Sequence, residues 1–255
     1  VKGVTPKTLL IIVDTHTTDF LESEEVYNKC SRIVVIDHNR KMVNFIKNAL
    51  VLCIEPNASS ASEMCTEIIT YIGDSDITSV EAEALLSGIV LDTKNFVMKT
   101  GVRTFEAAAF LKGKGADTVA VKRLFSNSIE SNRKRSEIIS AAHIYRGCAI
   151  ACTAPGTENA RLLSAQAADE LLEVSGVKAS FVIFDSGKDS VNISARSYGD
   201  LNVQIIMEYR GGGGHRTMAA AQLTGVNMEE AKSKLCEAID AKYPRTDGEE
   251  PTPIS

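Results

Sequence analysis

Three short apolar runs in the first quarter of the chain lack the two-residue alternation of a half-exposed strand. They are "TLLIIVD" (residues 8–14), "RIVVID" (32–37) and "LVLCIEP" (50–56). Continuous apolar runs of this length are typical of strands buried on both faces of a parallel sheet. We therefore predict three parallel strands in this part of the chain.

The segments after these runs carry helical patterns. Residues 59–73 begin with two serines, place an acid in the first turn and end at a glycine, as a capped helix does. Residues 79–96 predict a second helix, which brings the chain to Asp92. Further helices are predicted over 104–117 and 117–126. Together with the apolar runs, these helices favour an α/β fold with a parallel sheet.

Beyond residue 126 the pattern changes. Residues 126–139 are polar and charged, and we interpret them as a helical connector. The strands predicted after it are 147–155, 179–187 and 190–197, the last two joined by a turn at 186–189. The helices predicted there are 158–176, 202–211 and 227–243.

The chain is thus predicted to be an α/β protein of two domains. The parallel-sheet domain would occupy residues 1–125, the helical linker 126–139, and a smaller mixed-sheet α/β domain 140–245. Residues 246–255 are polar and are predicted to form a solvated tail. Because the chain starts with Val1 rather than Met, we expect it to be a fragment of a longer protein, truncated at its N-terminus.

Composition narrows the range of functions. The chain has 255 residues, of which 44% are hydrophobic and 24% charged, as in an ordinary soluble protein. Its formal net charge of −5 argues against a broad, non-specific grip on duplex DNA. The six cysteines are scattered, mostly among apolar neighbours, and are predicted to be free thiols in a reducing cytosol. No apolar run approaches the ~20 residues that span a bilayer.

Acids and an imidazole stand at the apparent ends of apolar strands. Asp14 closes the first run, and Asp37 and His38 close the second. Asp92 follows "GIVL" and is counted as a third such carboxylate. Each aspartate alone is more often a helix cap or turn residue, but their recurrence suits one or two divalent cations such as Mn²⁺ or Mg²⁺ at the carboxyl edge of the sheet.

A second signal is "YRGGGGHRTMAAA", residues 209–221. Four consecutive glycines do not suit a helix or strand interior, because each costs about 1 kcal/mol there. We interpret "HRTMAAA" as the start of a helix, whose free amide groups, with His215 and Arg216, would bind phosphate. A flexible hinge before a packed helix is the alternative. Ser194 and Arg196 are expected on one strand face and could reach the same ligand, unless that face is simply exposed.

Several segments together resemble a known family. "LLIIVDTH", "VVIDHN", "EPNASSASE", "GIVLDTKNF", "TGVRTF" and "GGGGH" are similar, in this order, to motifs of the DHH/DHHA1 phosphoesterase superfamily. "LDTKNF" and "SARSYGDLNVQIIMEYRGGGGH" resemble most closely the catalytic part of membrane-anchored bacterial cyclic-di-AMP phosphodiesterases. The resemblance covers about residues 8–243.

The resemblance implies roles for individual residues. Asp14, His38 and Asp92 match metal ligands of a site that holds two Mn²⁺ ions in the complete protein. Asp37 matches the acid of the DHH motif, which would orient His38. The residues that match the substrate side of the DHHA1 domain, where nucleotide would be held across the interdomain cleft, are Ser194, Arg196, Gly213, Gly214 and His215. Arg103 is a weaker candidate for a phosphate contact, because an exposed arginine at a helix start needs no ligand.

Two departures from the family pattern stand out. Asn39 occupies the position of the second histidine of the DHH motif, and an amide cannot carry a proton or a charge. An earlier family motif of the form His-x-x-x-Asp-x-Asp has no counterpart before residue 8. We therefore expect the metal site to be incomplete in this chain, and its turnover to be slow or absent.

The resemblance implies a manganese-dependent phosphodiesterase that converts cyclic-di-AMP to linear pApA, with Asp37 and Asn39 beside the metal site. Its ligand would be a cyclic dinucleotide or a short oligoribonucleotide. An oligoribonuclease or pAp phosphatase of the same superfamily, and a nucleotide-binding module without catalysis, remain alternatives. The family also implies a homodimer on the cytoplasmic side of the membrane, anchored by an upstream segment.

Overall fold

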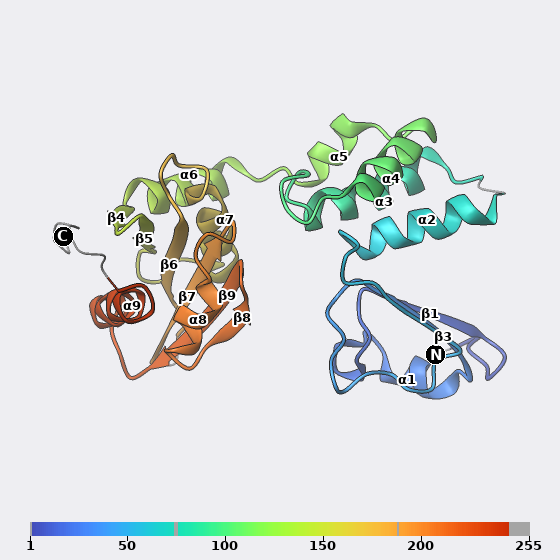
Figure 1. Cartoon of the computed structure of the whole chain (residues 1–255), viewed down its shortest axis with the longest axis horizontal. Helices are drawn as coiled ribbons and strands as arrows, with labels where there is room; N and C mark the ends of the chain where they lie inside the picture. Colours follow the sequence, from blue (N-terminus) through green and yellow to red (C-terminus); the bar gives the residue numbers. More distant parts are fainter. Residues whose placement is uncertain (1, 74–75, 188, 245–255) are drawn as a thin grey trace. The chain divides into compact units, whose positions relative to one another are not determined.

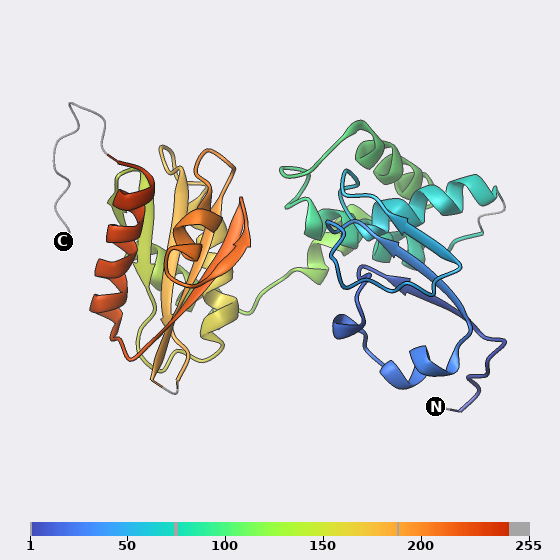
Figure 2. The ribbon, with the colours of Figure 1, turned by 60° about the horizontal axis from the view of Figure 1, so that its bottom comes forward.

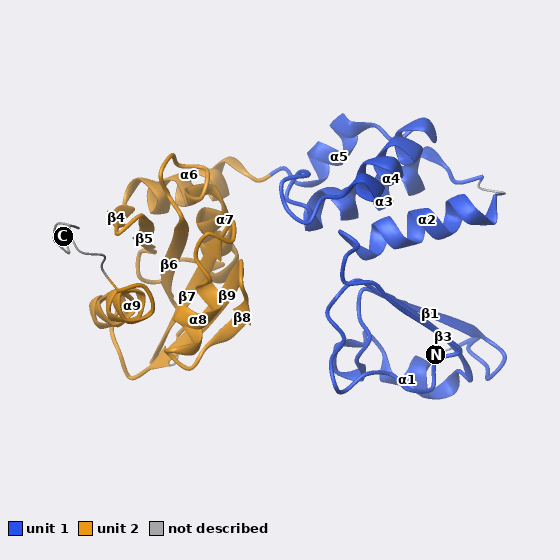
Figure 3. Ribbon diagram, in the orientation of Figure 1, with its two compact units in different colours: residues 1–126 blue, residues 127–255 orange. Residues whose placement is uncertain are grey.

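The computed structural model describes residues 2–73, 76–187 and 189–244. The chain forms two compact units, residues 1–126 and 127–255, each with its own sheet and its own core (Figure 3). Residues 246–255, predicted to be a solvated tail, lie outside the described residues. Lys188 of the predicted turn does so as well.

The first unit is built on a three-stranded parallel sheet in the order β1-β2-β3. Its strands are β1 (Leu9–Val13), β2 (Arg32–Asp37) and β3 (Val51–Ile54). The prediction of three parallel strands is confirmed, but burial on both faces is not, because Leu9, Ile11 and Val13 on one face of β1 are 46–54% exposed. Val13 pairs with Ile36, so the chain leaves β1 and β2 at the same edge of the sheet.

Helices pack on both faces of this sheet (Figures 1 and 2). On one face, Ile36 of β2 shares a buried cluster with Met64 of α2. On the other face, Ile33 and Val35 pack with Val26 of α1. The helices are α1 (Glu24–Lys29), α2 (Ala61–Ile72), α3 (Ser79–Asp92), α4 (Val102–Gly113) and α5 (Thr118–Leu124).

The start of α3 agrees with its sequence signal, whereas its end corrects an expectation. Thr78 and Glu81 form a reciprocal capping box ahead of the helix. The helix then runs through "GIVLD", so Asp92 stands at a helix C-terminus and not at a strand end. The apolar run is helical because Leu86 and Ile89, one turn apart, are buried in the core shared with α4 and α5.

The second unit contains a six-stranded mixed sheet in the order β4-β5-β6-β7-β9-β8. Its strands are β4 (His143–Tyr145), β5 (Cys148–Cys152), β6 (Ala179–Asp185), β7 (Ser190–Ser197), β8 (Gly213–His215) and β9 (Met218–Thr224). Strands β5 and β6 are parallel, and the other neighbouring pairs are antiparallel. The predicted strands β5, β6 and β7, and the two-domain α/β class, are confirmed.

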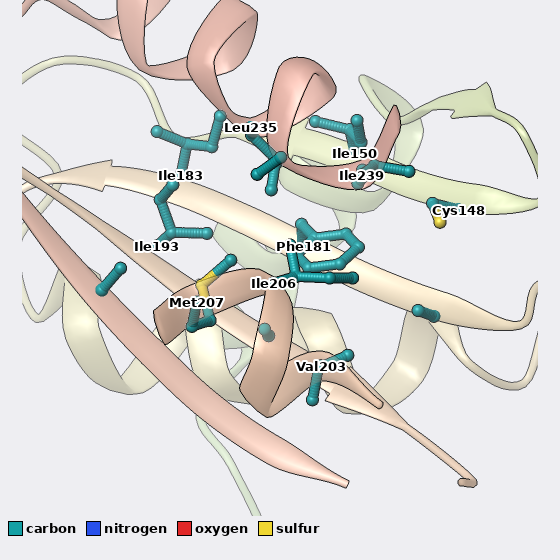
Figure 4. Packing of buried hydrophobic residues seen from close by; sticks show 14 of the residues in the cluster. Cys148, Ile150, Phe181, Ile183, Ile193, Val203, Ile206, Met207, Leu235 and Ile239 are labelled. Carbon is teal, nitrogen blue, oxygen red and sulfur yellow. The ribbon is translucent and has the colours of Figure 1, made fainter. Parts of the chain in front are cut away.

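The two faces of this sheet are covered differently. One face carries the large core around Phe181, Ile183 and Ile193, covered by α8 (Val203–Glu208) and α9 (Met228–Lys242) (Figure 4). On the other face, α7 (Ala160–Leu171) packs mainly on β5, β6 and β7. The segment interpreted as a connector forms α6 (Ile129–Ser140), which packs against α7. Among the described residues, no helix is both long and apolar enough to cross a bilayer.

One secondary-structure prediction is wrong. "HRTMAAA" does not begin a helix: Gly213–His215 form β8, and Met218–Thr224 return as β9 in an antiparallel hairpin. Alanine favours helices intrinsically, but the alanines of β9 fill a tight space. Ala219 and Ala221 are buried, and Gly212 and Gly214 lie directly against their backbone. Close packing between the two strands therefore overrides local propensity.

Candidate metal centre and ligand pocket

The three residues predicted to be metal ligands lie together in the first unit. Nε2 of His38 is 3.3 Å from Oδ1 of Asp14 and 3.6 Å from Oδ2 of Asp92. One ligand atom from each residue lies within 4.8 Å of the other two. Two carboxylates and an imidazole are donors that suit Mn²⁺ and related divalent cations. The side chains therefore fit a metal, although they come from three separate elements.

Backbone geometry brings Asp14 to this site. The residue follows β1 in a left-handed conformation with φ of 64°. Its N–H donates to the carbonyl oxygen of Ile36 at 3.0 Å, which continues the pairing of β1 with β2. Asp14 is thereby turned out of the strand beside the residues that end β2. His38 follows directly after β2 and is buried.

A tight turn fixes the position of Asp92. Residues 94–96 all have positive φ, between 49° and 63°, although none is glycine. Left-handed backbone of this kind costs roughly 1–2 kcal/mol per residue. Thr93 holds the turn, because its buried Oγ1 accepts from the N–H of Phe96 at 2.9 Å and donates to the carbonyl oxygen of Ile89 at 2.7 Å.

The electrostatic setting of Asp92 bears on cation binding. Partial burial raises the pKa of its carboxyl group. His38 acts in the opposite direction, and the negative charge of Asp14 adds to the rise in pKa. A proton therefore competes with a cation for Asp92 at higher pH than for an ordinary aspartate, and cation affinity should fall as the pH is lowered.

Asp37 has a different partner from the one we expected. Its fully buried carboxylate hydrogen-bonds through Oδ2 to Nδ1 of His16, not to His38. Nδ1 of His38 has no hydrogen-bond partner among the described residues. Nε2 of His16 accepts the N–H of Met42 at 2.9 Å, so the proton of the neutral ring lies on Nδ1 and is donated to Asp37. The expectation that Asp37 orients His38 directly is therefore wrong.

Asn39 belongs to the same network. Its backbone N–H and its Nδ2 both donate to Oδ1 of Asp37, at 3.0 and 2.9 Å. Its Nδ2 also lies 3.5 Å from the carbonyl oxygen of Asp14. Asn39 thus links the loops after β1 and β2 through Asp37.

Sequence reasoning missed His16. It is 2% exposed and joins the chain after β1 to the chain after β2. Its carbonyl oxygen also accepts the N–H of Ile46 at 2.8 Å. The available signal was its place two residues after Asp14, at the carboxyl end of a buried strand, but a single histidine did not reveal which acid it would meet.

A pocket of about 660 Å³ opens on the second unit. It lies on the α7 face of the sheet, over β7, β9 and β8. The residues predicted to bind substrate there all line it, and they are Ser194, Arg196, Gly213, Gly214 and His215. Further lining comes from α7, through Arg161 and Ala165, and from Phe184, Asn192 and Gln222.

Arg196 is held in place at the wall of this pocket. Its Nε lies 3.1 Å from Oδ1 of Asp169 on α7, and its Nη1 donates to Oγ of Ser194 at 3.2 Å. Ser194 and Arg196 therefore do lie on one face of β7, as their spacing indicates. A guanidinium held by a carboxylate is pre-organised to receive an anion, since less side-chain freedom is lost on binding.

The glycine run has a steric explanation at two positions and none at a third. A Cβ on Gly212 would lie 2.2 Å from the carbonyl oxygen of Ala220, and one on Gly214 would lie 2.5 Å from Cα of Ala219. Gly214 also has φ of 145°. A Cβ on Gly213 would meet no atom within 4 Å, and this residue faces the pocket. The protein itself therefore does not require glycine at position 213, whereas a ligand lying against the backbone would.

Arg103 is neither one of the three metal-fitting residues nor part of the pocket lining. It stands in α4, and its guanidinium makes two contacts of 2.6 Å with the carboxylate of Glu67 on α2. This ion pair raises the pKa of Arg103 above its ordinary value. The arginine is thus engaged with Glu67 within the first unit, and its proposed phosphate contact stays a prediction.

Family models match both units of the chain. Residues 1–89 match the DHH family, N-terminal domain, and residues 149–243 match the DHHA1 domain. The chain is 43% identical to cyclic-di-AMP phosphodiesterase PdeA of Listeria monocytogenes, covering 95% of this chain and 37% of the relative. It is 48% identical to cyclic-di-AMP phosphodiesterase GdpP of Geobacillus thermodenitrificans, covering 92% of this chain and 36% of the relative. The chain therefore spans about a third of the length of these relatives.

A solved structure supports the fold. An exopolyphosphatase-related protein from Bacteroides fragilis superposes with a TM-score of 0.79 at 22% identity, covering 92% of this chain and 72% of that one. The first unit carries the DHH match and the metal-fitting residues, and the second carries the DHHA1 match and the pocket. This chain is a member of the DHH/DHHA1 superfamily.

Proposed function

We propose that this chain is the catalytic part of a metal-dependent phosphodiesterase that hydrolyses cyclic-di-AMP to linear pApA. The observation that carries the proposal is the convergence of Asp14, His38 and Asp92 at one point of a DHH domain. The similarity to two cyclic-di-AMP phosphodiesterases supports the choice of substrate.

The first unit would supply the reaction centre. Asp14, His38 and Asp92 would hold the cation, for which we propose Mn²⁺ because oxygen and imidazole donors are mixed. A bound divalent cation of this kind stabilises charge on the phosphodiester and lowers the pKa of a coordinated water. Asn39 cannot donate a proton to a leaving group, since its amide does not titrate. We assign it the role of holding Asp37 and the loop after β1 in place.

The second unit would bind the nucleotide. Arg196 and His215 lie where phosphate oxygens can be bound, and the open backbone at Gly213 allows close approach. Neither group needs a metal for this task. Binding of nucleotide and binding of metal are therefore separable functions of the two units.

The test is hydrolysis of cyclic-di-AMP by this chain with and without Mn²⁺, with the products separated by chromatography. We expect Mn²⁺-dependent release of pApA that is slow, because the His-x-x-x-Asp-x-Asp motif has no counterpart before residue 8 and Asn39 replaces a histidine. The variants Asp14→Asn and Asp92→Asn should abolish it, because each removes a charged ligand atom. Asp200→Asn is the matched control, since Asp200 is exposed and does not line the pocket.

Other outcomes would redirect the proposal. Hydrolysis of pApA or pAp without cleavage of the cyclic dinucleotide would favour an oligoribonuclease or pAp phosphatase. Nucleotide binding that is independent of Mn²⁺ and never followed by turnover would favour a binding module. Absence of Mn²⁺ binding by the unsubstituted chain would refute the metal assignment in this chain.

A further inference from the structure

The ligand pocket of the second unit has two chemically different ends. Cross-strand pairs divide its floor into rows, because facing side chains of paired strands lie side by side. One end row consists of Arg196, Met218 and His215, which are partners across β7, β9 and β8. The other end row consists of Phe184, Asn192 and Gln222, which are partners across β6, β7 and β9. The first row carries the guanidinium of Arg196 and the imidazole of His215, and the second combines an aromatic ring with two amides.

The distance between the rows matches one nucleotide. Asn192 and Arg196 are four residues apart on β7, which corresponds to about 13 Å at the usual rise of a strand. This is comparable to a nucleoside monophosphate extended from its phosphate to the outer edge of its base. Between the two rows lie only small residues, Ser194, Ala220 and Gly213, which are also partners in register.

The amide end has unused hydrogen-bonding capacity. Oδ1 of Asn192 is buried and has no hydrogen-bond partner among the described residues. A buried carbonyl oxygen without a partner is unfavourable, so a donor arriving with a ligand would be favoured. Gln222 lies opposite Asn192, and its Nε2 donates to Oγ of Ser190 at 3.2 Å. Two carboxamides thus stand side by side next to Phe184.

We infer that this row is a nucleobase subsite with a preference for adenine. The inference rests on the proposed function, in that the ligand is taken to be a nucleotide whose phosphate lies at Arg196 and His215. Carboxamides of Asn and Gln pair with the N6 and N7 edge of adenine. The N6 amino group can fill the open acceptor of Asn192, whereas guanine presents its O6 carbonyl at that position. Phe184 supplies an apolar wall for the base.

The experiment measures binding of pApA, pGpG and ribose 5-phosphate to the chain by calorimetry in the absence of Mn²⁺. We expect pApA to bind about tenfold more tightly than pGpG, a difference within the range for one good amide–base pair. Asn192→Leu should weaken pApA binding about tenfold and leave ribose 5-phosphate unchanged. Gln222→Leu, at an exposed position, should weaken pApA binding to a smaller extent and tests the subsite if the first variant folds poorly.

The control is Gln204→Leu on α8, which packs on the opposite face of the sheet. It should bind all three probes as the unsubstituted chain does. Equal affinities for pApA and pGpG would overturn the adenine preference, and unchanged pApA binding in both Asn192→Leu and Gln222→Leu would overturn the subsite.

Failure of the proposed function has a different signature. In that case the chain would hydrolyse no dinucleotide with Mn²⁺, whereas loss of pApA affinity in Asn192→Leu would still support the subsite. Conversely, normal hydrolysis of cyclic-di-AMP with no effect of either Asn192→Leu or Gln222→Leu on pApA binding would leave the function standing and refute the subsite.

Discussion

The two units present their polar groups in opposite ways. In the first unit, the metal-fitting residues stand outside regular strands: Asp14 and His38 directly follow β1 and β2, and Asp92 ends a helix. In the second unit, Ser194 and Arg196 lie within a strand, on a sheet face that remains open as a pocket. Residues at element ends are placed by backbone turns, whereas residues on a strand face are placed by register.

This difference affects how each site can fail. The position of Asp14 depends on a network in which buried Asp37 joins His16 and Asn39. Loss of one of these hydrogen bonds should therefore weaken cation binding at the metal site. The shape of the pocket depends instead on the close approach of β8 to β9. A single methyl group added between these strands should therefore distort the pocket. The comparison between the two units is therefore tested by two kinds of substitution: those that remove a hydrogen bond near the metal site, and those that add a methyl group near the pocket.

The largest expected effect is a clean separation of the two binding functions. Asp14→Asn should weaken Mn²⁺ binding by about 10²-fold and leave metal-free pApA binding unchanged, because a carboxylate ligand is lost in the first unit alone. Arg196→Met should do the reverse. Calorimetric titration of both variants with both ligands measures this directly. If either substitution weakened both ligands equally, the two sites would not be independent.

A large loss of stability is expected from Gly214→Ala. The new methyl group would meet the backbone of Ala219 and Met218, in a conformation with positive φ, at a cost of about 2–4 kcal/mol. Gly213→Ala is the matched variant and should keep its stability, since no atom lies within 4 Å. It should nevertheless weaken pApA binding. Denaturant unfolding and calorimetry report the two effects, and loss of stability in Gly213→Ala would contradict the steric account.

His16→Leu should destabilise the first unit by about 2–3 kcal/mol, because it removes the hydrogen bond to the buried Asp37 carboxylate. His16→Gln can donate to Asp37 and accept from Met42, so it should recover part of both stability and Mn²⁺ affinity. Thermal unfolding followed by Mn²⁺ titration tests both variants. Full Mn²⁺ affinity in a folded His16→Leu protein would show that the network does not position the metal ligands.

A smaller effect is expected where α2 and α3 meet. A Cβ on Gly88 would lie 2.1 Å from Oγ of Ser62, so Gly88→Ala should cost about 1–3 kcal/mol. Gly113→Ala, near the end of α4 with free space around it, should instead stabilise by about 0.5–1 kcal/mol. Denaturant unfolding measures both. Combining Gly88→Ala with Ser62→Gly should restore part of the loss, and no restoration would mean that the contact is not the cause.

The smallest effect concerns thiol chemistry. Burial raises the pKa of Cys148 to about 12 and that of Cys236 to about 11, so at pH 8 their thiolate fractions are far below that of an ordinary cysteine. Cys53 is exposed on β3. A disulfide reagent added to the folded chain should therefore label Cys53 well before Cys148 or Cys236. Labelling mapped by mass spectrometry gives the order, and early modification of Cys148 would indicate opening of the second unit.

The sequence predicted the parts of the molecule that local patterns encode. Apolar runs located β1 to β3, and capping residues such as Thr78 located helix starts. It failed where packing between distant segments decides the outcome. The alanines of β9 favour a helix locally, but pairing with β8 makes them a strand. The hydrogen-bond partner of Asp37 depends on where His16 lies after folding. The metal-fitting and phosphate-side residues were named mainly through family motifs, whereas Asn192 and Gln222 carry no such signal.

Successive side chains of β7 point to opposite faces of the sheet, and this alternation limits how the pocket can evolve. Asn192, Ser194 and Arg196 face the ligand pocket, while Ile193 and Ala195 between them are buried in the core on the opposite face. Inserting one residue between Asn192 and Arg196 would reverse every side chain beyond it and turn a guanidinium into the core. The pocket can therefore lengthen only in steps of two residues, or about 7 Å. A change of ligand length in this lineage has to occur in such steps, or through the loops around the strand.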